Sequence, residues 1–142
     1  MKKSAQKKEK VLAVDPGRKK CGLAVVCSED GILHRAVVPC PEFEMAFRKV
    51  YEKHCPLTVL LGSSTGSKEI AEQIESQSQI PARLVDERHT TELAKLRYFE
   101  ECPPRGLWKL VPVGLQTPPV CYDDFAAVVL AERYLKEQCN DK

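Results

Sequence analysis

The chain has 142 residues, a net charge of +2, and 43 % hydrophobic and 30 % charged residues, as expected for one soluble globular domain with a single core. No apolar run reaches the roughly 20 residues that a membrane-spanning helix needs, and the charged N-terminus lacks a following signal-type apolar segment. We therefore expect a single cytoplasmic domain without a membrane contact; the near-neutral charge neither favours nor excludes a nucleic-acid partner.

In the first third of the chain, the pattern predicts a lysine-rich solvated tail over residues 1–9, followed by three strands. The apolar run at residues 11–14 ends at Asp15 and is typical of a buried central strand. After the Pro16-Gly17 break, strands are expected over residues 22–26 and 32–38, separated by a Ser-Glu-Asp-Gly turn. The three strands should form an antiparallel meander.

The rest of the chain alternates helices with short apolar strands. Phe43, Phe47 and Val50 recur at helical spacing. The expected helices cover residues 42–54, 67–78, 90–101 and 123–138, and the strands cover residues 57–61 and 83–86, with a proline-rich loop over residues 102–120. This alternation favours right-handed crossovers. We predict an α/β fold with a mixed five-stranded sheet, an antiparallel meander followed by parallel strands, flanked by helices in one domain over residues 10–139.

Seven cysteines are scattered along the chain without a Cys-x-x-Cys pair. This spacing gives little support to a structural zinc site, and the odd number argues against a closed disulfide framework. We expect reduced thiols that pack as small hydrophobic side chains.

Carboxylates stand at the edges of three apolar elements. Asp15 ends the first strand, Asp86 and Glu87 end the last strand, and Asp123 and Asp124 open the last helix. In open α/β sheets, ligands bind at the carboxyl ends of parallel strands, so these acids could share one crevice. Taken singly, each has an ordinary explanation as a turn former, a helix cap or a solvated side chain.

Clustered carboxylates repel one another unless a cation lies among them. Hard divalent ions prefer such oxygen ligands, and Mg²⁺ also bridges to substrate phosphate. Two ions about 3.5–4 Å apart can stabilise both the attacking and the leaving oxygen of a phosphodiester. The acids therefore indicate metal-dependent phosphodiester chemistry.

Three stretches resemble the YqgF (RuvX) family. They are VLAVDPGRKKCGLAVV over residues 11–26, LVDERHTT over residues 84–91 and CYDDFAAVVLAERYL over residues 121–135. The first is similar to the family's Asp-x-Gly-x-x-x-x-Gly-x-Ala motif, the second to its Asp-Glu-Arg-x-[Ser/Thr]-Thr stretch, and the third to its terminal Asp-x-x-x-Ala helix. Together they span nearly the whole chain beyond the tail.

The resemblance implies an RNase H-like fold related to Holliday junction resolvases. By matched positions, Asp15, Glu87 and Asp123 correspond to the family's metal-binding catalytic residues, with Asp124 as a further candidate ligand and Mg²⁺ or Mn²⁺ as the cofactor. The implied activity is a nuclease that matures the 5′ end of pre-16S ribosomal RNA; junction resolution is the alternative. The expected partner is RNA, or a DNA junction, with a ribosome-associated role and a homodimer both compatible with the resemblance.

Basic and hydroxyl side chains flank these acids and could contact phosphates. The candidates for nucleic-acid binding are Arg18, Lys20, Arg88, Ser64, Thr65 and Ser67. The ordinary alternatives are solvated cations and an N-capping loop before a helix.

Two other functions remain open from the sequence. A phosphotransferase of the actin and hexokinase type also begins with a strand, an acid and a glycine, but it needs two lobes to enclose ATP, and this chain has room for one. A non-catalytic module of the same fold could bind RNA or a ribosome-associated partner without cleavage, although all three acids are present.

Overall fold

The computed structural model describes residues 9–63, 67–78, 80–86, 90–102, 110 and 123–140, with the backbone alone for residues 90, 91, 123, 139 and 140. Most of the predicted tail and of the predicted proline-rich loop therefore lie outside the described residues. None of the helices in the described ranges is long and apolar enough to cross a membrane.

A mixed five-stranded sheet forms the centre of the molecule, in the order β3-β2-β1-β4-β5. The first three strands pair antiparallel, whereas β4 pairs parallel with both β1 and β5. The strands are β1 (Lys10–Asp15), β2 (Lys20–Cys27), β3 (Gly31–Pro39), β4 (Thr58–Gly62) and β5 (Ala82–Val85). The central strand, β1, is buried on both faces, which explains its unbroken apolar sequence.

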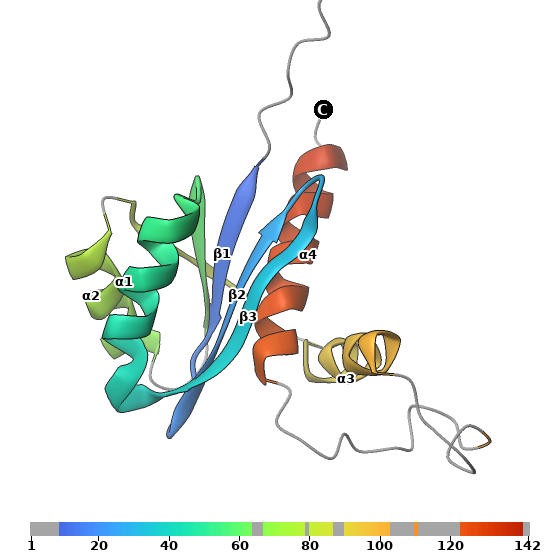
Figure 1. Ribbon diagram of the computed structural model, residues 1–142, viewed down its shortest axis with the longest axis horizontal. Helices are drawn as coiled ribbons and strands as arrows, with labels where there is room; N and C mark the ends of the chain where they lie inside the picture. The colour runs from blue at the N-terminus through green and yellow to red at the C-terminus, as the bar shows by residue number, and fades with distance from the viewer. Residues whose placement is uncertain are drawn as a thin grey trace, which may run out of the picture.

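Helices cover both faces of this sheet (Figure 1). Two of them, α1 and α2, lie on one face, while α4 lies on the other and α3 packs beside α4. The bounds are η1 (Cys40–Glu42), α1 (Phe43–His54), α2 (Ser67–Gln77), α3 (Thr90–Glu101) and α4 (Asp123–Asn140).

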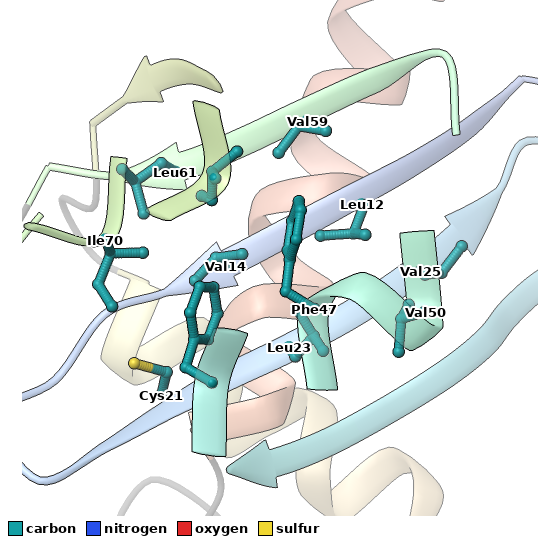
Figure 2. Packing of buried hydrophobic residues seen from close by; sticks show 12 residues of the cluster. Leu12, Val14, Cys21, Leu23, Val25, Phe47, Val50, Val59, Leu61 and Ile70 are labelled. Atoms are coloured by element: carbon teal, nitrogen blue, oxygen red, sulfur yellow. The ribbon is translucent and has the colours of Figure 1, made fainter. Parts of the chain in front are cut away.

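The face under α1 and α2 is filled by large side chains. Phe43, Phe47 and Val50 of α1 are buried at helical spacing. Figure 2 shows Phe47 and Val50 lying over the strand residues whose side chains point to this face. Ile70 of α2 belongs to the same cluster. The members of this cluster from the strands are Leu12, Val14, Cys21, Leu23, Val25, Val59 and Leu61.

The opposite face is lined by smaller side chains. Ala13 and Ala24 of the sheet meet Ala127 and Ala131 of α4, with larger residues around them. Because an alanine methyl group takes little space, the axis of α4 can lie close to the sheet, where it contacts β1, β2, β3 and β4.

The predicted α/β architecture is confirmed, including the antiparallel meander and the parallel half of the sheet. The boundaries differ by small amounts. The predicted helix over residues 42–54 is preceded by a 3₁₀ turn, η1, which begins at Cys40. Helix α1 ends after His54 because Cys55 adopts a left-handed conformation (φ 47°) and donates its backbone N–H to Tyr51 O.

Candidate active site

Asp15 lies at the carboxyl end of the central strand and is half-buried. Side chains alternate between faces along a strand. Val11 and Ala13 pack toward α4, so Asp15 projects from the same face. The sequence-predicted acid therefore stands at the end of β1 on the side that α4 covers.

The two strands beside Asp15 present glycine at the same level. Gly22 of β2 is the direct partner of Asp15. On the other side Leu61 pairs with Val14 in parallel register, so Gly62 follows at the level of Asp15. Because neither glycine carries a side chain, no Cβ atom flanks the Asp15 carboxylate from these two positions.

The loop over residues 16–19, which joins β1 to β2, is tightly folded. A Cβ atom at Gly17 would lie 2.4 Å from the backbone oxygen of Lys20, so only glycine fits there. Arg18 is exposed in this loop, and Lys20 is half-buried at the start of β2. By strand alternation Lys20 shares the face of Asp15, since Ala24, four residues further, packs toward α4.

An ion pair fixes the first turn of α4 to the edge strand β3. Arg35 Nη1 lies 3.2 Å from Asp124 Oδ2, and the guanidinium carbon lies 4.3 Å from the centre of the Phe125 ring. The other Asp124 oxygen accepts the backbone N–H of Phe125 at 3.0 Å. Asp124 is only 8 % exposed, so a buried carboxylate is balanced here by a guanidinium. This arrangement favours an anchoring role for Asp124.

Asp123 begins α4, but its side chain lies outside the described residues. In Figure 1 the N-terminal end of α4 lies at the same end of the sheet as the carboxyl end of β1. The anchored neighbour, Asp124, therefore fixes the backbone from which the Asp123 side chain projects.

The carboxyl end of β5 is held by α4. Arg133 Nη1 donates a hydrogen bond to the backbone oxygen of Asp86 at 3.2 Å, and the guanidinium carbon of Arg83 lies 5.6 Å from the centre of the Tyr134 ring. The backbone N–H of Ser63 donates to Val85 O at 3.0 Å, which joins the ends of β4 and β5. The parallel strands β4 and β5 thus end together at one end of the sheet.

The remaining predicted site residues lie around the starts of α2 and α3. Glu87, Arg88, Ser64 and Thr65 lie outside the described residues, while Ser67 is half-buried at the start of α2. Within the described ranges, no group of three or more His, Cys, Asp or Glu side chains could hold a metal ion. Of the three matched acids, only the Asp15 side chain belongs to those ranges.

The chemistry of the acids nevertheless fits a divalent cation. Carboxylate oxygens are the ligands that Mg²⁺ and Mn²⁺ prefer. Asp15 is half-buried, and a glycine lies beside it on each neighbouring strand. These features make the end of β1 a suitable place for one ligand of such an ion.

Sequence reasoning missed the contact between Arg35 and Asp124, which are 89 positions apart. A signal was present, because an acid at the start of a strongly apolar helix needs a cationic partner when it is buried. The sequence did not indicate which of the basic residues would supply it.

Comparisons with known proteins support the fold. No family model and no curated protein matches the chain. Among solved structures, RuvC of Thermus thermophilus superposes with a TM-score of 0.60 at 15 % identity, over 92 % of this chain and 96 % of that one. An exopolyphosphatase from Cytophaga hutchinsonii gives a TM-score of 0.44 at 10 % identity, over 63 % of this chain and 39 % of that one. The match to RuvC establishes that this chain has the RNase H-like fold.

Proposed function

We propose that this protein is a metal-dependent nuclease that hydrolyses phosphodiester bonds in structured nucleic acid. The observation that carries the proposal is the position of Asp15, which ends the central strand of an RNase H-like sheet at the end of the sheet where α4 begins. The likeness of the fold to RuvC supports the same class of activity.

In this proposal Asp15, Glu87 and Asp123 hold one or two Mg²⁺ or Mn²⁺ ions at the edge where β1, β4 and β5 end. The bound ion supplies charge stabilisation for the attack of water and the departure of the oxyanion. Asp15 is held in place because β1 is paired on both sides. With an ion bound, the carboxylates would hold it and would leave the binding of phosphate oxygens to the neighbouring basic residues.

Basic residues around this edge hold the flanking phosphates. Arg18 is exposed on the loop directly after Asp15, and Lys20 shares the face of Asp15. A guanidinium can bind phosphate oxygens through two parallel hydrogen bonds. We assign the same role to Arg88, and we assign phosphate binding at the start of α2 to Ser64, Thr65 and Ser67.

The motifs and the fold favour different substrates. The three stretches that resemble the YqgF family favour 5′-end maturation of pre-16S ribosomal RNA, which we propose as the reaction. The likeness to RuvC favours a four-way DNA junction as the alternative.

Cleavage of both substrates by matched variants tests the proposal. Labelled precursor RNA and a labelled four-way DNA junction are incubated with Mg²⁺, Mn²⁺ or a chelator, using wild type, Asp15→Asn and Asp30→Asn. The control, Asp30→Asn, makes the same change in the exposed turn between β2 and β3, at the opposite end of the sheet. We expect cleavage by wild type and Asp30→Asn, and its loss with the chelator or in folded Asp15→Asn.

The preferred substrate then decides between RNA maturation and junction resolution. Equal cleavage by wild type and Asp15→Asn would contradict the placement of the site. Binding of either substrate without any cleavage would support the non-catalytic module instead.

A further inference from the structure

Two cysteine sulfurs lie side by side at the end of the sheet that carries Asp15. The Sγ atoms of Cys21 and Cys40 are 3.8 Å apart. Cys21 is fully buried in β2 on the face covered by α1, and Cys40 is half-buried at the start of η1. Both are reduced in this structure.

Cys40 also holds the loop over residues 16–19. Its backbone N–H donates to Lys19 O at 2.9 Å. Its thiol lies 3.4 Å from Gly17 O and 3.6 Å from Arg18 O, within range of a hydrogen bond from the S–H group. Since this loop connects directly to Asp15, any displacement of Cys40 changes the support of the proposed catalytic acid.

We propose that Cys21 and Cys40 form a modification site, a pair that peroxide oxidises reversibly to a disulfide and that thereby changes the loop beside Asp15. The formation of the bond is independent of the proposed nuclease function. Its consequence for cleavage rests on that function.

The reaction has two balanced steps. Hydrogen peroxide transfers one oxygen to the Cys40 sulfur, giving a sulfenic acid and one water. The Cys21 sulfur then attacks the Cys40 sulfur, forming the S–S bond, and the sulfenic oxygen leaves with the two remaining protons as a second water. Both electrons of the oxidation go to the peroxide, and a dithiol reductant reverses the change.

Burial decides the order of attack. Cys21 is fully buried, so dissolved peroxide does not reach its sulfur first. Cys40 is half-buried beside an exposed loop and meets the oxidant first. Cys21 then acts as the resolving thiol from the adjacent strand.

The geometry explains why closing this bond would move the loop. Cys40 lies two positions beyond Val38, the strand partner of Cys21. The two Sγ atoms are 3.8 Å apart, whereas a disulfide bond joins two sulfurs at about 2.03–2.05 Å. The chain at Cys40 must therefore shift toward β2. Formation of the S–S bond also removes the S–H donor that faces Gly17 O.

The test oxidises the full-length protein and locates the bond. Wild type, Cys21→Ala, Cys27→Ala and Cys40→Ser are treated with peroxide at low protein concentration and mapped by mass spectrometry after digestion. Cys27 is the matched control, because it is a buried cysteine at the other end of the same strand. In wild type and Cys27→Ala only, we expect the peptides that contain Cys21 and Cys40 to be linked, with a mass two hydrogens lower than that of the separate peptides. Reduction should separate them again.

Loop movement is read by hydrogen exchange of the Cys40 amide, which is bonded to Lys19 O. We expect several-fold faster exchange after oxidation of wild type and no change in Cys40→Ser, whose hydroxyl keeps a donor at the same position. Oxidation of Cys40 to sulfinic acid without a bond to Cys21 would overturn the proposal. Unchanged amide exchange in the cross-linked protein would overturn the link to the loop.

Cleavage assays separate this proposal from the nuclease proposal. We expect oxidation to lower cleavage several-fold in wild type, with recovery on reduction, while Cys40→Ser keeps its activity. A cross-link that moves the loop in a protein without nuclease activity would refute the proposed function alone. A cross-link that leaves cleavage unchanged would overturn the regulatory consequence.

Discussion

The two faces of the sheet are built differently. Under α1 and α2, phenylalanine, leucine, isoleucine and valine fill a thick layer. Under α4, alanines from both sides meet at the centre, and the helix lies across four strands. The first face stabilises the fold through buried apolar volume. The second face sets where the N-terminal end of α4 stands relative to Asp15, so it determines the geometry of the proposed site.

The largest expected effect on stability comes from the first face. Phe47 is fully buried, and Phe47→Ala should lower the free energy of unfolding by about 3–5 kcal/mol, because it removes apolar contacts and leaves a cavity. Urea denaturation measures this loss, with Met45→Ala, at a side chain that is 67 % exposed, as the control. The folded variant should keep its Mn²⁺ affinity. Weaker metal binding would contradict the account in which the face under α1 and α2 stabilises the fold without setting the geometry of the site.

Enlarging an alanine under α4 should affect both stability and the site. Ala127 is fully buried against the sheet. Ala127→Leu should lower the free energy of unfolding by about 1–3 kcal/mol through overpacking, and it should weaken Mn²⁺ binding because α4 is displaced. Ala46→Leu, on the half-buried side of α1, is the control for the same change on the other face. If both variants bind Mn²⁺ alike, the position of α4 does not set the site.

The anchor of α4 should show a smaller effect. Arg35→Met leaves the buried Asp124 without its cation and should cost about 1–2 kcal/mol of stability. Arg35→Lys should lose less, because it keeps the charge but lacks the planar group that stacks on Phe125. A double-mutant cycle with Asp124→Asn measures the coupling. Strict additivity of the two changes would rule out the anchor.

The smallest effect is a pH dependence on the α1 side. The rings of His34 and His54 lie 6.2 Å apart. Burial and the charge of Lys53 lower the pKa of His34; burial, Lys53, His34 and Lys10 lower the pKa of His54. Below the unfolded-state pKa of 6.5, the unfolded chain takes up protons that the folded protein does not. Stability should therefore fall as the pH drops from 6.5 toward the folded-state pKa values.

Midpoints of urea denaturation between pH 7.5 and pH 5.5 would reveal this dependence. Even pH 5.5 lies roughly one unit above the usual carboxylate pKa, so most carboxylates stay ionised over this range. His34→Gln with His54→Gln should flatten the curve. A double variant with the wild-type slope would assign the dependence to other groups.

The architecture was predictable because each strand is short and bounded by turn residues. The buried face of α3 was harder. Its sequence favours a face with Leu93, Leu96 and Phe99, but Leu93 and Leu96 are 41 % and 45 % exposed, while Ala94 and Tyr98 are buried. This difference arises because α3 packs on α4 rather than on the sheet, with Tyr98 against Phe125. The sequence of one helix does not indicate which other element that helix packs against.

The candidate site was predictable at Asp15, where a buried strand ends in an acid. The contacts that support it were not, because they join residues far apart in the chain. The pairs Arg35 with Asp124 and Cys21 with Cys40 both depend on the register of β3 against β2, which local sequence patterns do not encode. The roles of Glu87 and Asp123 stay predictions.

Binding of Mn²⁺ to wild type, Asp15→Asn and Asp30→Asn, followed by electron paramagnetic resonance, tests the central claim most directly. We expect Asp15→Asn to weaken the affinity by at least about tenfold, since even the loss of an outer-shell partner has an effect of that size, and Asp30→Asn to bind as wild type does. Equal affinity in wild type and Asp15→Asn would show that the end of β1 is not the metal site.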